Sequence, residues 1–340
     1  MSIKLKELIT LKYGKRQIDV EDENGTIPIY GTGGVFGKAN VSLYSKPSIL
    51  LGRKGTIDKP FWVDHPFWCV DTMFYSIIDD TKVVPKYLFY NLLNIDFSKY
   101  NEGTTIPSLR IETLNNIDIS LHSNDEQHYI VDILGSIDEK IENNEQLINI
   151  FENLAAKKYL DFANKTSTKT RLEDVIELFD SKRIPLSSRE REQRKGIYPY
   201  YGATGILDYV NGFLFSGEYV LFAEDGTVTD TNGHPIVQLV NGSFWVNNHA
   251  HILKGKNGWH DYTLYVALKQ LNVDKAVTGA VQPKINQANL LSLEIPNLSN
   301  NNLQTINTEL DVVFHKVFHL RSENKKLQEL KGLYLKKFFE

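Results

Sequence analysis

The sequence predicts an α+β protein in which two related mixed regions are each followed by a long helix. Three observations lead to this prediction. The chain has 340 residues, 41% of them hydrophobic, which suits roughly two domains with separate cores. Landmarks of the first half recur in the second half, and two long stretches show heptad spacing. The expected boundaries are 1–125 and 166–297 for the mixed regions, and 126–165 and 298–340 for the helices.

An internal repeat carries this domain assignment. Residues 27–34 (IPIYGTGG) recur as residues 198–205 (YPYYGATG), a shift of 171 positions. Because the later landmarks keep their order, the chain contains two copies of one unit, related by a pseudo-twofold arrangement. The further landmarks that recur at nearly the same shift are residues 49–56 with 220–227, Phe67-Trp68 with Phe244-Trp245, and Pro107 with Pro283.

Within each mixed region, short runs of Tyr, Phe, Val and Ile alternate with Gly, Asn, Asp and Pro. This pattern is typical of strands joined by turns. It indicates small α+β domains and leaves the order of the strands open. Short helices are expected at residues 4–11, 85–93, 172–179 and 261–271.

The two long stretches predict an antiparallel coiled coil. One register of the two helices places Asn144 opposite Asn324; in it, the residue numbers of any two facing positions add up to 468. Two buried amides that face each other are expected to fix this register at a cost in stability. Among the interior pairs, Ile137 opposite Lys331 fits poorly. The residues predicted to pair are Ile130, Leu134, Ile141, Asn144, Ile148, Phe151, Val313, Val317, Leu320, Asn324, Leu327 and Tyr334.

Charge favours this pairing modestly. Residues 126–165 contain 4 basic and 8 acidic side chains, whereas residues 298–340 contain 7 and 5. Exposed ion pairs are weak, so the opposite signs add little. Helices that pack only on their own domains, or that pair with a second copy of the chain, remain alternatives.

Several kinds of site are disfavoured by the sequence. The glycine-rich run at 30–38 lacks P-loop spacing, because Thr32 stands where a glycine is needed and Ala39 where a hydroxyl is needed. His249 and His251 would share one strand face, but the matching first-copy residues, Thr72 and Phe74, cannot bind a metal. We therefore expect no metal site, no catalytic residues and no enzyme activity on this chain.

The cellular setting is inferred from Cys69 and from hydropathy. A single cysteine excludes a disulfide framework and fits a reducing cytoplasm. No run of about 18 uncharged apolar residues occurs, so no membrane contact is expected. The net charge of −4 excludes a strongly basic nucleic-acid binder but allows a local basic patch.

A basic patch is present at residues 182–195, which contain six basic and two acidic side chains and precede a tyrosine-rich run. Arginine-rich loops beside aromatic residues suit contacts with phosphates and base edges, although a solvated surface loop would look similar. A Gly-Pro loop in each copy is a second candidate, and its alternative role is to cap the domain before the helix. The predicted DNA-binding residues are Tyr30, Lys38, Arg53, Lys54, Thr104, Ser108, Arg110, Lys182, Arg183, Arg189, Arg191, Arg194, Lys195, Tyr201, Gln282, Lys284 and Asn286.

One repeat position differs sharply in charge. Arg53-Lys54 of the first copy lies over Glu224-Asp225 of the second. Arginine favours guanine, and a carboxylate accepts a hydrogen bond from cytosine N4, so the two copies are expected to prefer different bases. The alternative, that the acidic pair is buried or caps a turn, stays open.

These residues together resemble the specificity subunit of type I restriction-modification enzymes. The resemblance rests on an ordered, duplicated set of motifs and covers nearly the whole chain. The motifs are GRKGTI at 52–57, Phe67-Trp68 with Asp71-Thr72, Gly103 with Pro107 and Leu109, DEQ at 125–127, KRIPL at 182–186, YYGATG at 200–205 and EDG at 224–226.

The resemblance implies that each mixed region is a target recognition domain for one half of a bipartite, asymmetric double-stranded DNA target. It implies that the helices are spacers that bind two methyltransferase subunits, joined by restriction and translocase subunits. S-adenosylmethionine, ATP and Mg would belong to those partners, with no cofactor on this chain. The alternative is an interaction scaffold in a phage-defence complex that never touches DNA.

Overall fold

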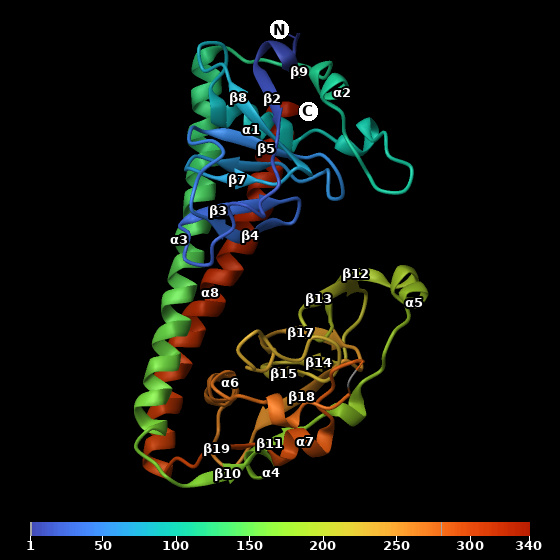
Figure 1. Cartoon of the computed structure of the whole chain (residues 1–340). Helices are drawn as coiled ribbons and strands as arrows, with labels where there is room; N and C mark the ends of the chain where they lie inside the picture. Colours follow the sequence, from blue (N-terminus) through green and yellow to red (C-terminus); the bar gives the residue numbers. More distant parts are fainter. Residues whose placement is uncertain (1, 280) are drawn as a thin grey trace. The chain divides into compact units, whose positions relative to one another are not determined.

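The computed structural model describes residues 2–279 and 281–340, and the chain divides into two compact units (Figure 1). Unit 1 comprises residues 1–142 and 324–340, and unit 2 comprises residues 143–323. Each unit combines one mixed α+β region with part of both long helices. The predicted fold class, two related α+β regions with two long helices in a coiled-coil arrangement, is confirmed.

The described residues of unit 1 form three sheets. The larger sheet is antiparallel, with the order β2(Ile9–Tyr13), β8(Met73–Ile78), β5(Ser48–Gly52) and β6(Phe61–Val63). The smaller sheet has the order β4(Gly34–Ala39), β3(Ile27–Gly31) and β7(Trp68–Cys69). The third sheet pairs β1(Ser2–Lys4) with β9(Asp118–Ser120), and the short helices are η1(Leu5–Glu7), α1(Pro85–Leu93), η2(Phe97–Tyr100) and α2(Ile111–Asn115).

Unit 2 repeats this arrangement. Its larger sheet has the order β11(Ile176–Leu178), β18(Ala250–Gly255), β15(Tyr219–Ala223) and β16(Val237–Val240). Its smaller sheet has the order β13(Ile206–Val210), β12(Lys195–Tyr201), β17(Ser243–Val246) and β14(Phe215–Ser216). The third sheet pairs β10(Lys169–Arg171) with β19(Glu294–Pro296), and the short helices are α4(Leu172–Val175), η3(Asp180–Lys182), α5(Ser188–Gln193), α6(Asp261–Lys269), η4(Asp274–Ala276) and α7(Gln287–Ser292).

Local sequence explains most of these elements. Strands β5 and β15 are short apolar runs that lie inside their sheets, and all residues of β5 are buried. Helix α1 begins at Pro85, whose fixed φ suits a first helical position. The predicted helix at 4–11 is wrong, because after η1 the chain pairs with β8 as strand β2. The predicted helix at 172–179 ends at Val175, where β11 takes over.

The long helices are α3(Asn124–Ala163) and α8(Asn300–Phe339), each within about two residues of the predicted bounds. Two hydrogen bonds fix the start of α3. Ser123 Oγ donates to Glu126 Oε2 at 2.7 Å, and Gln127 Oε1 accepts from the Val84 N–H at 2.9 Å. Across residues 2–279 and 281–340, no helix has the length and apolar character needed to cross a membrane.

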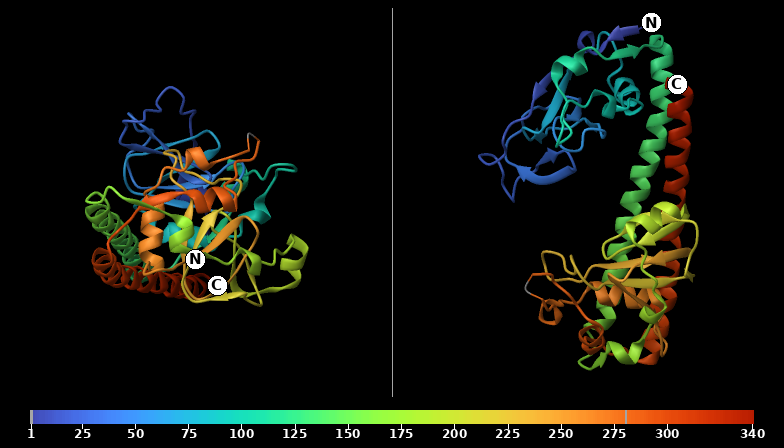
Figure 2. Two further views of the ribbon diagram at one scale, coloured as in Figure 1. Left: turned by 90° about the horizontal axis from the view of Figure 1, so that it is seen from below. Right: turned by 90° about the vertical axis from the view of Figure 1, so that its right-hand side faces the viewer.

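Within each unit α3 and α8 lie side by side and antiparallel (Figures 1 and 2). In unit 1, Asn324 Nδ2 donates to Ile141 O at 3.3 Å, and Ile130 and Leu134 share a core with Tyr334. Lys331, predicted to fit the apolar seam poorly, directs its ammonium to Asp138 Oδ1 at 2.6 Å. An ion pair thus removes that misfit from the seam.

In unit 2 the same pairing continues. Asn144 Nδ2 donates to Glu323 Oε2 at 2.8 Å, and Lys158 Nζ lies 2.8 Å from Glu309 Oε2. The apolar side of the pairing is one core cluster. It contains Ile148, Phe151 and Ala155 from α3 together with Val313 and Val317 from α8.

Candidate nucleic-acid interface

In unit 1 several loops meet at one end of the larger sheet. The segment after β5 is attached to the turn between β7 and β8, because the Arg53 N–H donates to Thr72 O at 2.8 Å. The same segment is attached to the Gly-Pro loop, where the Gly55 N–H donates to Pro107 O at 2.9 Å. The loop cluster of unit 1 is defined here as residues 14–16, 53–57, 70–72 and 103–110.

Unit 2 forms the same connections with different side chains. The Glu224 N–H donates to His249 O at 2.8 Å, and the Gly226 N–H donates to Pro283 O at 3.0 Å. The repeat seen in the sequence is therefore a repeat of backbone hydrogen bonds around the loops. The loop cluster of unit 2 is defined as residues 179–184, 224–228, 247–249 and 281–286.

A tryptophan holds the first loop of each cluster. Trp68 Nε1 donates to Lys15 O at 2.9 Å, and Trp245 Nε1 donates to Ile184 O at 2.6 Å. Both indoles are largely buried, so this hydrogen bond satisfies their only polar atom. This explains why the Phe-Trp landmark occurs in both copies.

The side chains under the unit 1 cluster are aromatic and cationic. Tyr13 packs on Phe74 with ring centroids 5.2 Å apart, and the Arg53 guanidinium lies 5.1 Å from the Tyr13 ring centroid. Arg53 Nη1 also donates to Asp71 O at 2.9 Å. Arg53 is therefore oriented by a cation–π contact and by the backbone.

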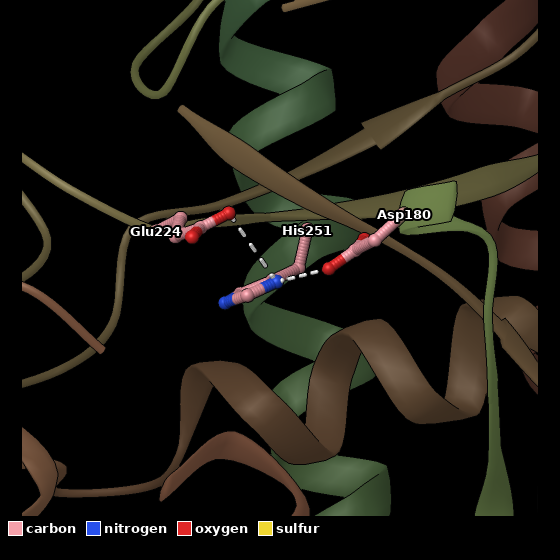
Figure 3. A group of neighbouring side chains, drawn as sticks. All are labelled: Asp180, Glu224 and His251. Carbon is pink, nitrogen blue, oxygen red and sulfur yellow. Dashed lines mark hydrogen bonds and ion pairs between the residues drawn. The ribbon is translucent and has the colours of Figure 1, made fainter. Parts of the chain in front are cut away.

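At the matching place in unit 2 the side chains form an ion-pair network. Figure 3 shows Asp180 and Glu224 on either side of His251, which occupies the strand position of Phe74. His251 Nδ1 lies 2.5 Å from Asp180 Oδ2 and 3.7 Å from Glu224 Oε2. Arg183 Nη1 lies 2.7 Å from Glu224 Oε2. Lys284 Nζ lies 3.1 Å from Glu224 Oε1, so two cations flank this carboxylate.

The network lowers the pKa of both carboxylates. Burial alone would raise the pKa of Asp180, but the hydrogen bond and charge of His251, with the Ile252 N–H, outweigh it and hold this pKa below its usual value. Burial likewise opposes ionisation of Glu224, and the Arg183 hydrogen bond with the charge of His251 lowers its pKa. Both groups are therefore stabilised in the charged form.

Three residues of this network carry the types of side chain that ligate metal ions. Asp180, Glu224 and His251 offer ligand atoms within 4.8 Å of one another. Arg183 and Lys284, however, already contact these carboxylates and supply the positive charge that a metal ion would bring. The chemistry is that of a closed ion-pair network, and His249 contacts Asp225 outside it.

A backbone bridge in each cluster carries side chains of different charge. Lys54 pairs with Ser108 in unit 1, and Asp225 pairs with Lys284 in unit 2. The cation of the bridge in unit 1, Lys54, lies on the segment after β5. The cation of the bridge in unit 2, Lys284, lies on the Gly-Pro loop. The two clusters share a backbone and present different chemistry.

The basic segment 182–195 divides into paired and exposed cations. Arg191 Nε lies 3.3 Å from Asp208 Oδ2, and Lys195 Nζ lies 2.9 Å from Asp208 Oδ1. Arg183 is largely buried in the network described above. The exposed cations with no ion pair among the described residues are Lys182, Arg189 and Arg194.

The other predicted residues of unit 1 lie in different settings. Lys38 on β4 and Lys54 are exposed, and Thr104 is exposed in the Gly-Pro loop. Arg110 Nε lies 3.0 Å from Glu102 Oε2. Tyr30 is almost buried, with its hydroxyl 3.2 Å from His65 Nε2, so it belongs to the core of the smaller sheet.

The remaining predicted residues of unit 2 also differ in exposure. Tyr201 is half-buried and packs edge-on against Phe244, with ring centroids 5.8 Å apart. Asn286 caps α7, because its Oδ1 accepts from the Asn289 N–H at 2.9 Å. Gln282 is exposed beside Lys284 in the loop cluster.

The structure adds two cations that sequence reasoning missed. Lys15 and Arg16 follow β2 and are exposed in the first loop of the unit 1 cluster. They lie where the chain enters the loop held by Trp68. Lys182 occupies a comparable place in unit 2, and this correspondence between the copies is the feature of the sequence that could have identified Lys15 and Arg16.

Comparisons with known proteins agree with this duplicated architecture. The family model described as the type I restriction modification DNA specificity domain matches residues 1–153 and 164–332. A putative type I restriction enzyme specificity subunit of Haemophilus influenzae is 37% identical over 125 residues, which are 37% of this chain and 31% of that protein. A putative type I specificity subunit of Mycoplasma genitalium is 27% identical over 183 residues, 50% of this chain and 43% of that protein. The aligned parts span less than half of either relative.

Among solved structures, the S subunit of a type I restriction-modification system from M. genitalium aligns with 100% of this chain and 96% of its own. The TM-score is 0.62 at 20% sequence identity, so this likeness supports the fold alone. The family match covers most of the chain in two successive segments, one for each copy of the repeat. The chain therefore belongs to the family of type I restriction-modification specificity subunits.

Proposed function

We propose that this specificity subunit reads a bipartite DNA target, one half with the loop cluster of each unit, and performs no catalysis itself. The observation that supports this most is the pair of loop clusters with matching backbone hydrogen bonds and different charges. A scaffold duplicated for support alone has no need for Lys54 opposite Ser108 in one copy and Asp225 opposite Lys284 in the other. A reader of two unlike half-sites needs such a difference.

The exposed cations are assigned by their surroundings. Lys182, Arg189 and Arg194 in unit 2, and Lys15 and Arg16 in unit 1, are free to contact phosphates. Lys54 and Lys284 lie on the segments that differ between the copies, so we assign them to base edges. Such cations supply the salt-dependent part of DNA affinity.

Arg183 and Glu224 receive a positioning role in this proposal. Their side chains are 15% and 13% exposed and bind each other, so neither is free to reach a base. Glu224 also holds Lys284 at 3.1 Å, which orients this lysine at the surface of the cluster. Asp225 contacts His249 and is a weaker candidate for base contact than Lys284.

Partner binding is proposed for α3. Leu147, Ile150 and Leu154 are exposed at helical spacing, and together they form an apolar stripe on one face of the helix. Membership of the family suggests that two adenine methyltransferase subunits bind such spacers, with restriction subunits added to the complex. S-adenosylmethionine, ATP and Mg would then be bound by these partners. The partners would also supply positive charge that this chain, with net charge −4, lacks.

The test is to purify the full chain with the adenine methyltransferase encoded with it, and to map methylated adenines on plasmid DNA by single-molecule sequencing. We expect one bipartite motif that disappears when this chain is omitted. A matched control carries Leu147→Asn and Ile150→Asn, which should abolish partner binding without unfolding unit 2. If the complex assembles but methylates no defined sequence, the chain is an interaction scaffold and the proposal is wrong.

A further inference from the structure

Each unit has a β-bulge at the same place in its smaller sheet. On β3 and β4, Ile29 pairs with Gly37 and Tyr30 pairs with Val35, which leaves Phe36 as the extra residue. On β12 and β13, Tyr200 pairs with Asp208 and Tyr201 pairs with Ile206, which leaves Leu207 as the extra residue. A bulge redirects the side chain of the extra residue, and both units use it for a large apolar residue.

These two bulge residues face solvent in both units. Phe36 is 54% exposed and Leu207 is 56% exposed. Their strand neighbours Val35 and Ile206 are also exposed, so each hairpin presents two successive large apolar side chains. Such pairs on a surface are a liability unless something covers them.

A glycine lies directly beside the side chain of each bulge residue. A Cβ at Gly31 would lie 3.3 Å from Phe36 Cδ1, and a Cβ at Gly202 would lie 2.6 Å from Leu207 Cδ1. Each side chain therefore lies close to the backbone at this glycine, and a larger residue there would shift it. The exposed orientation is built into both hairpins.

Each hairpin forms one margin of its smaller sheet, in which β3 also pairs with β7 and β12 also pairs with β17. Strands β4 and β13 are edge strands of the smaller sheets, as Figure 1 shows. Exposed cations belong to both hairpins: Lys38 follows Phe36 on β4, whereas Arg194, whose O accepts from the Asn211 N–H, lies at the end of the β12–β13 pairing away from the turn. A hairpin that carries an exposed apolar residue and a cation is complementary to a polyanion with apolar groups inside a groove.

We propose that the hairpins β3–β4 and β12–β13 enter the DNA major groove and that Phe36 and Leu207 each contact the C5-methyl group of a thymine, one in each half-site. This inference rests on the proposed function and deepens it. The major groove admits a two-stranded ribbon, and the thymine methyl is the apolar group exposed there. Phe36 and Leu207 are thus specificity-determining residues, distinct from the charged residues of the loop clusters.

The test uses the full complex with its methyltransferase and begins from the motif that the wild-type complex methylates. Oligonucleotide duplexes of that motif are prepared with each thymine replaced singly by uracil, which lacks the methyl group. At one thymine in each half-site the wild-type methylation rate should fall roughly fourfold, the factor expected for burying one methyl group. Phe36→Ser should remove this uracil sensitivity in one half-site only, and Leu207→Ser in the other.

Matched variants control for folding and for general loss of apolar surface. Phe36→Leu and Leu207→Phe keep an apolar side chain at the bulge and should retain most of the uracil sensitivity. Ile18→Ser and Val312→Ser remove other exposed apolar side chains from units 1 and 2, outside the hairpins and the loop clusters, and should leave the motif unchanged.

The outcomes separate this inference from the proposed function. A wild-type complex that methylates no defined sequence overturns both. A defined motif in which no single uracil replacement slows methylation, or serine variants that keep full uracil sensitivity, overturns the inference and leaves the proposed function standing. Serine variants that no longer bind the methyltransferase identify the hairpins as protein-docking sites, which also overturns it.

Discussion

Arg183 Nη1 and Glu224 Oε2 lie 2.7 Å apart within unit 2, at the place where unit 1 has Arg53 beside Tyr13. One backbone segment is thus held by a salt bridge in one copy and by a cation–π contact in the other. The cation comes from the segment itself in unit 1 and from the preceding loop in unit 2. The duplication kept the loop and exchanged the interactions that hold it.

Breaking the salt bridge should destabilise unit 2. Removing one partner of a largely buried ion pair leaves the other uncompensated, which costs on the order of 3 kcal/mol. We therefore expect Arg183→Leu to speed amide hydrogen exchange in segment 224–228 and to lower the unfolding temperature. Arg189→Ala, at an exposed position, should change neither. Equal exchange rates in the two variants would contradict the assigned role of Arg183.

The same network should make unit 2 sensitive to acid. The pKa values of Asp180 and Glu224 are lowered in the folded chain, so unfolding raises them. Their contribution to stability is complete above the ordinary carboxyl range and is lost as pH falls through the lowered values. Hydrogen exchange in segment 224–228 should accelerate in this range more than in segment 53–57, which is held by the cation–π contact of Arg53 with Tyr13. The same acid response in both segments would argue against the network.

Sequence patterns predicted those elements whose formation depends on residues close together in the chain. The heptads located both long helices to within about two residues, because a helix repeats its environment every turn. The sequence left open whether Glu224 contacts a base or is buried, because its partner Arg183 lies 41 positions away and the pairing depends on strand order. Lys15 and Arg16 were missed although the comparable loop of unit 2 contains Lys182. The helix predicted at residues 4–11 does not form, because the pairing of β2 with β8 outweighs the local helix propensity.

The exposed cations of unit 2 should set the salt dependence of DNA binding. Each phosphate contact contributes a slope of about 0.9 in log affinity against log salt concentration. Replacing Lys182, Arg189 and Arg194 together by alanine should reduce the slope by up to about 2.7 if all three contact phosphates. Affinity measured by fluorescence anisotropy over a salt series tests this. Lys169→Ala, on β10, is the control and should leave the slope unchanged, whereas an unchanged slope in the triple variant would exclude phosphate contacts.

Base contacts of unit 1 should affect one half-site only. Lys54→Ala removes an exposed cation from the segment after β5, and Arg53→Ala also removes the contact with Tyr13. We expect each variant to relax base preference in one half of the methylated motif, at a cost of about 1–3 kcal/mol per lost base contact. Methylation rates on single-base variants of both half-sites provide the measurement. A uniform loss on all sequences would mark these residues as phosphate contacts instead.

The spacing between the half-sites should follow the length of the long helices. Deleting residues 139–145 from α3 together with residues 323–329 from α8 removes one heptad from each helix, keeps the apolar register and leaves the stripe of Leu147, Ile150 and Leu154 in place. Seven residues span about 10 Å of helix, which corresponds to roughly three base pairs of DNA. We therefore expect the methylated motif to keep both half-sites and to lose about three base pairs from the gap between them.

A deletion in α3 alone provides the control for this spacer experiment. It leaves α8 one heptad longer, so the pairs that now join Lys158 to Glu309 and Asp138 to Lys331 cannot both form. This variant should unfold at lower temperature and lose methylation, whereas the double deletion should retain both. Single-molecule sequencing of methylated plasmid DNA measures the number of base pairs between the two half-sites. A double deletion that methylates the original motif with its original gap would show that the helices do not set the spacing.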